Sequence, residues 1–183
     1  MTTILQLLLD RLDTPIGEML VVADRGGNLR ATFWTEHEAR MHRALQLQYG
    51  QNGFTLEPAC NPHDLTKAIG RYFAGDLAAI DTLPVQTAGT SFQREVWHAL
   101  RGIACGTTIS YAQLAERIGR PKAVRAVGLA NGSNPVGVVV PCHRVIGSDG
   151  SLTGYGGGIE RKRWLLEHES KQADQKFRQK PLF

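Results

Sequence analysis

The sequence predicts an α/β N-terminal domain, with a small sheet and helices, followed by a mainly helical C-terminal domain that contains a helix-turn-helix. Three observations support this. Residues 1–84 contain a hairpin pattern and then helices, residues 85–170 contain repeated helix start signals, and the Pro- and Thr-containing segment 82–89 reads as a connector. Residues 171–183 form a basic tail that could be disordered. At 183 residues the chain can bury a core as two small domains.

The first domain is expected to begin its sheet with a hairpin. Gly17–Ala23 and Leu29–Trp34 are rich in apolar and β-branched residues, and the five residues between them, 24–28, are typical of a turn. Two antiparallel strands are therefore predicted at these positions.

Two helices are expected after the hairpin. Thr35 and Glu38 have the spacing of a capping box, which predicts a helix through about Tyr49. Leu65–Phe73 is a second, short amphipathic helix that Gly75 should stop. Nothing in this half indicates chemistry.

The second domain shows two further helix starts. Thr90 and Gln93 form one capping-box pattern, and Ser110 and Gln113 form another. The helix after Thr90 carries apolar residues every four positions, as expected for a buried face. These residues are Phe92, Val96 and Leu100.

A tight turn separates the helix after Ser110 from the next one. The turn is 119–121, and Pro121 suits the first helical position because its missing N–H would have no partner there. The second helix should run to about Asn131, with Gly132 as its stop, and it carries Lys122 and Arg125. This order is that of a helix-turn-helix. By itself, the pattern favours a simple packed helical pair, since many helical hairpins look similar.

The second helix of this pair has unusually small side chains, which would let its backbone approach a narrow minor groove. The small residues are Ala123, Ala126, Gly128 and Ala130. The charge distribution agrees with a polyanionic partner, although an ordinary solvated surface is the alternative. Residues 1–84 carry 7 Lys and Arg against 10 Asp and Glu, a net charge of −3, whereas residues 85–183 carry 14 against 7, a net charge of +7.

The segment that follows is the most informative part of the chain. Val138–Val140 reads as a buried strand, and Pro141 should end its pairing. Cys142 and His143 would then lie at the rim of a core. A small, inert buried cysteine is the alternative, but a thiol beside an imidazole is also the beginning of a nucleophilic site.

Composition excludes several classes of protein. No window is long and apolar enough for a membrane span, so a cytoplasmic protein is expected. The three cysteines, Cys60, Cys105 and Cys142, show no C-x-x-C spacing, and the six histidines show no H-E-x-x-H pattern. No metal site and no cofactor are therefore predicted. The glycine-rich loop 148–158 also lacks a phosphate-binding register and is better suited to close approach of a planar ligand.

Six motifs in order resemble those of the O6-alkylguanine-DNA alkyltransferases. The strong resemblance covers roughly residues 89–169. The motifs are Ser110-Tyr111-x-x-Leu114-Ala115, Lys122-Ala123-x-Arg125-Ala126-Val127-Gly128, Asn134-Pro135, Pro141-Cys142-His143-Arg144-Val145, Gly154-Tyr155 and Trp164-Leu165-Leu166-x-His168-Glu169.

The resemblance implies repair of DNA by direct reversal, in which an alkyl group moves irreversibly from O6 of guanine to Cys142. The room that Gly156 should leave in the loop extends this expectation to O4-methylthymine. A thiol must ionise to attack, so its pKa has to fall below about 8.5. Adjacent side chains on a strand point to opposite faces, so contact with His143 needs a bend or a bridging water. The resemblance implies the water, with Glu169 orienting the imidazole.

The resemblance also implies the partner, which is double-stranded DNA containing O6-alkylguanine, and a monomer that needs no protein partner. Because the lesion is stacked in the duplex, the nucleotide must flip out. Arg125 would fill the space, Tyr111 would rotate the nucleotide and contact the purine, and Asn134 would tighten the turn before the cysteine. The remaining implied contacts to substrate or DNA are Val145, Tyr155, Gly156, Lys122, Ala126 and Gly128. Some family members have serine at the position of Gly156, and the glycine should leave room for larger lesions.

Three other functions compete with this interpretation. A helix-turn-helix regulator would use Cys142 structurally but leaves the Pro-Cys-His segment unexplained. A cysteine hydrolase based on Cys142, His143 and Glu169 lacks an evident oxyanion hole. A lesion-binding protein without repair activity would have the cysteine replaced.

Overall fold

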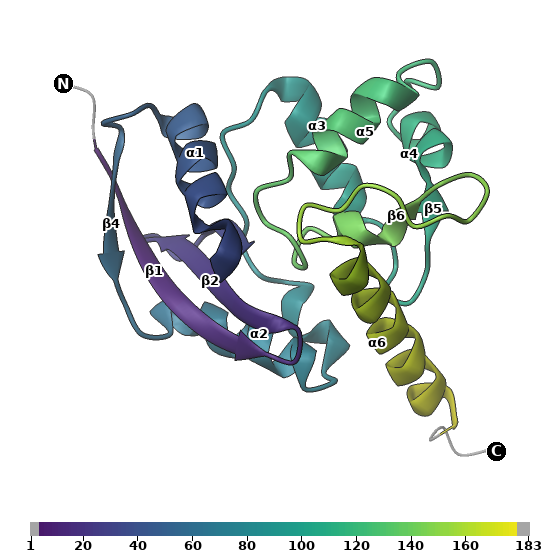
Figure 1. The fold of residues 1–183 in the computed structure, drawn as a ribbon, viewed down its shortest axis with the longest axis horizontal. Helices are drawn as coiled ribbons and strands as arrows, with labels where there is room; N and C mark the ends of the chain where they lie inside the picture. The colour runs from purple at the N-terminus through teal and green to yellow at the C-terminus, as the bar shows by residue number, and fades with distance from the viewer. Residues whose placement is uncertain (1–3, 179–183) are drawn as a thin grey trace. The chain divides into compact units, whose positions relative to one another are not determined.

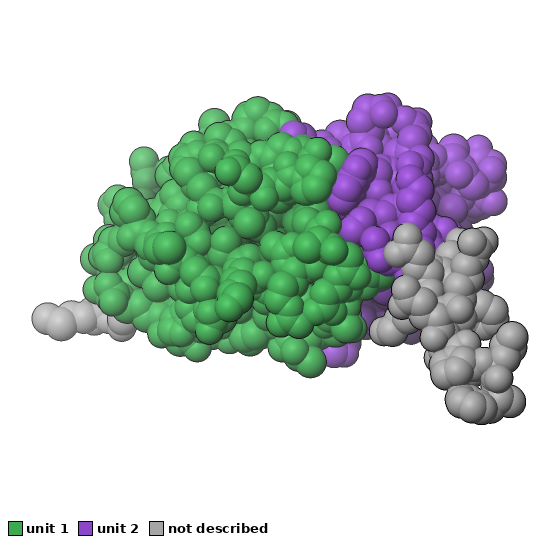
Figure 2. Space-filling model, turned by 90° about the horizontal axis from the view of Figure 1, so that it is seen from below, with its two compact units in different colours: residues 1–94, 135–139 green, residues 95–134, 140–183 purple. Residues whose placement is uncertain are grey.

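The computed structural model describes residues 4–178, which divide into two compact units. Of the described residues, the first unit contains 4–94 and 135–139, and the second contains 95–134 and 140–178 (Figure 2). The sequence-based limits placed residues 85–94 and 135–139 in the second domain, whereas in the structure they belong to the first unit. No helix in the described part of the chain is long and apolar enough to cross a membrane.

The first unit is built on a mixed four-stranded sheet with the order β3-β2-β1-β4 (Figure 1). β1 pairs antiparallel with β2 and parallel with β4, and β2 pairs antiparallel with β3. The predicted strands are confirmed as β2 and β3. β1 and β4 were not foreseen, because β1 carries three charged residues and β4 is short. The bounds are β1 Leu5–Thr14, β2 Gly17–Asp24, β3 Leu29–Trp34 and β4 Phe54–Pro58.

Helices cover both faces of this sheet, as the alternation of its side chains requires. α1 (Glu38–Tyr49) buries Met41 and Leu45 against Leu7 and Val22 on one face. α2 (Leu65–Phe73), confirmed at the predicted bounds, packs on the other face, where the rings of Phe73 and Trp34 meet edge to face at 6.4 Å between centroids. The α/β character of the first half is thereby confirmed.

The predicted capping box before α1 was wrong. Thr35–His37 form a 3₁₀ turn, and α1 starts at Glu38 without a side-chain cap. The Thr35 hydroxyl instead donates to the Glu18 carboxylate at 2.6 Å. Thr35 therefore lies in the 3₁₀ turn with its hydroxyl bonded to β2, and His37 stands at the N-cap position of α1.

The second unit is mainly helical, as predicted. Both predicted capping boxes are present, since Gln93 N–H donates to Thr90 Oγ1 and Gln113 N–H to Ser110 Oγ, with reciprocal bonds from the glutamine side chains. A two-stranded parallel pair, β5 with β6, joins Ile109 to Val145. The bounds are α3 Ser91–Arg101, β5 Ile109–Ser110, α4 Tyr111–Arg117, α5 Val124–Gly132, β6 Val145–Ile146 and α6 Ile159–Arg178. Of these helices, α3 starts in the first unit and continues into the second at Glu95.

α4 and α5 form the predicted helix-turn-helix, with differences at the ends. Gly119 has a φ of +69°, and the N–H of Arg120 donates to the carbonyl of Ala115, so a Schellman motif ends α4. Pro121 lies in the turn and not at the first helical position, because α5 begins at Val124. α6 continues to Arg178, beyond the expected start of the tail, and residues 179–183 lie outside the described residues.

The valine segment is buried but is not the predicted strand. Val136 makes one parallel bridge to Thr32 of β3, after which the chain turns. Val138 has a φ of +70°, a strained conformation for a β-branched residue. Cys142–Arg144 then form a 3₁₀ turn. The expectation that Cys142 and His143 alternate on an extended strand was therefore also wrong.

Candidate active site

Cys142 lies in the second unit on the 3₁₀ turn, and only 6% of its surface is exposed. The Asn134 amide donates to the carbonyl of Val140 at 2.8 Å and also hydrogen bonds the Cys142 sulfur. Asn134 thus contacts both ends of the Val140–Cys142 segment.

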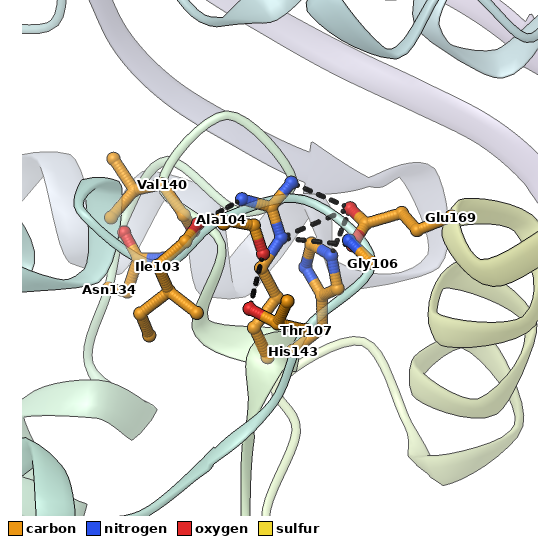
Figure 3. Close-up of polar contacts among 9 residues, drawn as sticks. Ile103, Ala104, Gly106, Thr107, Asn134, Val140, His143 and Glu169 are labelled. Atoms are coloured by element: carbon orange, nitrogen blue, oxygen red, sulfur yellow. Dashed lines mark hydrogen bonds and ion pairs between the residues drawn. The ribbon is translucent and has the colours of Figure 1, made fainter. Parts of the chain in front are cut away.

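The imidazole of His143 and the carboxylate of Glu169 form a buried pair (Figure 3). His143 Nε2 lies 2.9 Å from Glu169 Oε1, and neither side chain is exposed. A carboxylate held this way only accepts hydrogen bonds, so Nε2 carries the hydrogen. His143 Nδ1 is buried without a hydrogen-bond partner among the described residues. Its lone pair is the basic site of the cluster.

Arg144 joins the same carboxylate. Its Nε donates to Glu169 Oε2 at 2.9 Å and its Nη2 to Oε1 at 2.8 Å, while Nη1 donates to the carbonyl of Ile103 at 2.7 Å. The backbone N–H of Gly106 donates to Oε2 at 3.2 Å. Burial would raise the pKa of Glu169, but His143 and Arg144 outweigh it and hold that pKa far below its usual range.

Burial favours the protonated form of the Cys142 thiol. Burial raises the pKa of Cys142, and the opposing hydrogen bond from Asn134 and the charge of Lys162 do not cancel it. Burial also lowers the pKa of His143, with Glu169 opposing. Ionisation of Cys142 therefore needs a base that takes up the proton.

Two side chains, Lys162 and Tyr111, hold the glycine-rich loop 148–158 by donating hydrogen bonds to the carbonyl of Thr153. Lys162, fully buried on α6, donates to the carbonyl of Val145 at 2.6 Å and to that of Thr153 at 2.7 Å. The Tyr111 hydroxyl donates to the same Thr153 carbonyl at 3.1 Å. Pairing of β5 with β6 sets Tyr111, the first residue of α4, beside the segment that follows Cys142.

The loop also brings an aromatic ring to the cluster. The ring of Tyr155 meets the imidazole of His143 edge to face at 6.5 Å between centroids. Burial, with a contribution from Cys142, raises the pKa of Tyr155 well above its ordinary value. Gly156, the next residue, is exposed.

The surface of α5 presents the predicted DNA-binding residues. Lys122 precedes the helix, and both it and Arg125 are exposed, as is Ala126. The ring of Tyr111 lies against Gly128, where an added Cβ would meet the ring at 3.8 Å. Among the described residues, Lys122 and Arg125 make no hydrogen bond or ion pair with the Cys142 cluster. The exposed face also includes Leu129, which is 71% exposed and was not singled out from the sequence.

Comparison with known proteins identifies the family. A family model described as 6-O-methylguanine DNA methyltransferase, DNA binding domain, matches residues 91–171. A methylated-DNA–protein-cysteine methyltransferase of Shigella flexneri is 53% identical over 165 residues, which cover 90% of this chain and 96% of that protein. This chain belongs to the methylated-DNA–protein-cysteine methyltransferase family.

Solved structures of the family share the fold. Mycobacterium tuberculosis OGT in complex with DNA matches with a TM-score of 0.73 and 40% identity, over 91% of this chain and 94% of that one. The O6-methylguanine-DNA methyltransferase of the archaeon Pyrococcus kodakaraensis matches with a TM-score of 0.67 and 26% identity, over 89% and 98%. The sequence-based recognition of this family is confirmed.

Sequence reasoning missed two buried cations. Arg144 stands inside the Pro-Cys-His-Arg-Val motif, so the motif itself was a signal, but no role was given to it. No sequence pattern indicated that Lys162 is buried, because a lysine in a charged helical segment normally faces solvent. No group of three or more His, Cys, Asp or Glu that could hold a metal occurs within residues 4–178.

Proposed function

We propose that this protein repairs DNA by direct reversal, moving the alkyl group of O6-alkylguanine onto Cys142. The observation that carries the proposal is the buried thiol beside Asn134 and the His143–Glu169 pair, in a chain of this family. The relatives are named for methyl transfer from methylated DNA to a protein cysteine, and one solved relative is bound to DNA. DNA is accordingly the partner.

The reaction follows from the tautomer of His143. Nδ1 takes the thiol proton through a bridging water, and the resulting thiolate attacks the alkyl carbon. The bond between that carbon and O6 breaks, and its electron pair stays with the guanine. The proton then passes from the imidazolium of His143 to the guanine. Guanine and a thioether at Cys142 are the products. A thioether is a poor leaving group, so each chain acts once.

The lesion reaches the thiol by base flipping. Ala126, which is small and exposed on α5, suits close approach to a narrow minor groove, where Arg125 would take the place of the extruded nucleotide. Ala130, the other small side chain of this helix, is buried. Lys122 would contact the phosphate backbone, and Ala126 and Gly128 would allow close approach. Tyr111 would help rotate the nucleotide and hydrogen bond to the purine.

The loop and the turn would hold the extruded base. The carbonyls of Cys142 and Val145 would accept from the exocyclic amine of guanine, and backbone N–H groups near Tyr155 and Gly156 would face O6. Gly156 has no side chain to crowd the alkyl group, so larger O6 groups and O4-methylthymine should also react. A monomeric, cytoplasmic protein without a cofactor or an obligatory protein partner completes the proposal.

Stoichiometry tests the proposal directly. Limiting protein mixed with excess duplex DNA containing O6-methylguanine should gain about one methyl group per chain, located on the Cys142 peptide, because the thioether cannot be cleared. Cys142→Ala should abolish transfer and leave DNA binding largely intact. A plateau several-fold higher, or sequence-specific binding without a gain in mass, would contradict the proposal and favour a turnover enzyme or a regulator.

Arg125→Ala separates base flipping from attraction to DNA. The variant should repair duplex DNA at least about tenfold more slowly, since unstacking costs a few kcal/mol, yet react normally with free O6-benzylguanine, which needs no extrusion. Lys122→Ala is the matched control. Because it removes one phosphate contact, the slope of log binding constant against log salt concentration should decrease in magnitude by about one. Equal losses on both substrates would show that Arg125 supports the pocket instead.

A further inference from the structure

Arg144 is a buried cation at the active site for which the reaction above has no use. Only 4% of its surface is exposed, and its guanidinium grips both oxygens of Glu169 while also donating to the Ile103 carbonyl. A fixed two-bond contact of this kind holds the carboxylate in one orientation. The residue that follows His143 in the chain therefore orients the carboxylate that binds the imidazole.

The charges of this cluster balance only when His143 is neutral. Glu169 carries one negative charge, and Arg144, which does not deprotonate in proteins, carries one positive charge. Glu169 Oε1 is shared between Arg144 Nη2 at 2.8 Å and His143 Nε2 at 2.9 Å. A proton on His143 would leave the buried cluster with an uncompensated positive charge, which a low-dielectric site disfavours.

The other titratable groups around His143 do not supply a counter-charge. Lys162 on α6 adds another positive charge and lowers the His143 pKa, as Arg144 does, although burial is the largest cause. Cys142 and Tyr155 both have raised pKa values and are neutral. Glu169 is thus the negative charge next to His143, and Arg144 already compensates it.

We propose that Arg144 is a positioning residue that keeps His143 in its neutral, Nε2-protonated form by compensating the charge of Glu169. Without the guanidinium, the buried carboxylate would draw a proton onto His143, and an imidazolium has no lone pair at Nδ1 to receive the thiol proton. The consequence for alkyl transfer rests on the proposed function, whereas the protonation state of His143 does not.

Nitrogen NMR of the isotopically histidine-labelled, substrate-free protein tests the protonation state. The wild type should show His143 neutral, with hydrogen on Nε2, across the range where a free imidazole titrates. Arg144→Met should show an imidazolium at neutral pH, whereas Arg144→Lys, which keeps the charge, should stay neutral. Arg163→Met, which removes an exposed ion pair with Glu160 on α6, is the matched control and should match the wild type. His143→Gln identifies the signal.

Alkyl transfer measured against pH provides the second readout. Arg144→Met should react at least about tenfold more slowly than wild type at neutral pH, because a pKa raised by one unit above ambient leaves about a tenth of the imidazole neutral. Its rate should recover as the pH rises through the raised His143 pKa. Structural damage alone would lower the rate at every pH.

Several outcomes overturn the proposal. A neutral His143 in Arg144→Met, or a rate deficit that does not recover with pH, shows that the arginine does not set the protonation state. If Arg144→Met does not fold, Arg144→Lys decides alone, since an imidazolium in that variant contradicts the charge argument. A wild type that transfers no alkyl group but shows the expected NMR signals would refute the proposed function and leave this inference standing.

Discussion

At Glu169 one buried carboxylate accepts hydrogen bonds from an imidazole, a guanidinium and a backbone N–H. A set of contacts this dense is stable only as a whole, because each partner compensates a buried charge or dipole of another. The contribution of this cluster to the free energy of unfolding is therefore not the sum of the separate hydrogen bonds. It is the cost of leaving one member of the cluster unpaired.

Glu169→Gln should destabilise the second unit by about 3–5 kcal/mol, since it leaves the guanidinium of Arg144 buried without a counter-charge. Urea unfolding followed by circular dichroism would measure the change. The double variant with Arg144→Met should regain part of the loss, because both charges are then absent. Glu160→Gln, at an exposed ion pair on the same helix, should be indistinguishable from wild type. Equal destabilisation by the single and double variants would contradict this account.

The residues of the site differ in how far the sequence could predict them. Cys142, His143 and Glu169 carry functional groups whose combination points to nucleophilic chemistry, and they lie in recognisable motifs. The buried state of Arg144 depends on a carboxylate 25 positions away. No local pattern reports such a pairing, so its role emerged only from the folded structure.

At the scale of elements, periodicity and capping predicted what local interactions decide. β2, β3, α2 and the starts of α3 and α4 follow directly from such signals. Partners distant in sequence decided the rest. The Thr35 hydroxyl donates to Glu18 on β2. Of the valines in 136–140, Val136 alone makes a bridge to β3, at Thr32, so a run of valines typical of a strand became a turn.

Lys162 shows how one side chain can fix an element that has no regular structure. Lys162→Met should increase hydrogen exchange in residues 150–157 by at least about tenfold, because a hydrogen bond from a charged donor contributes about 1.5–3 kcal/mol. Mass-spectrometric exchange would measure it. Lys171→Met, at an exposed position on the same helix, is the control. Unchanged exchange in the loop would show that Tyr111 and the backbone hold it without the lysine.

At the scale of the whole molecule, the two units bury different titratable groups whose pKa values are lowered by folding. The second unit contains His143 and Glu169, both with lowered pKa values. The first contains Asp24, which is buried with Arg30 and Asn28; burial raises the Asp24 pKa, but these partners outweigh it and lower it. Each group resists protonation in the folded state and accepts a proton in the unfolded chain, so each makes folding less favourable in acid.

The second unit should therefore lose stability first as the pH falls. The unfolded chain binds a proton at His143 below its ordinary pKa of 6.5, and at Glu169 below 4.5, whereas the folded unit does not. Asp24 begins to act only below 3.8. Each such group lowers the unfolding free energy by up to about 1.4 kcal/mol per pH unit between its two pKa values. Hydrogen exchange, corrected for intrinsic rates, should show amides of 140–170 losing protection at a higher pH than those of β1 and β2. His143→Gln should delay this loss. Simultaneous loss of protection in both units would show that the buried cluster does not set acid stability.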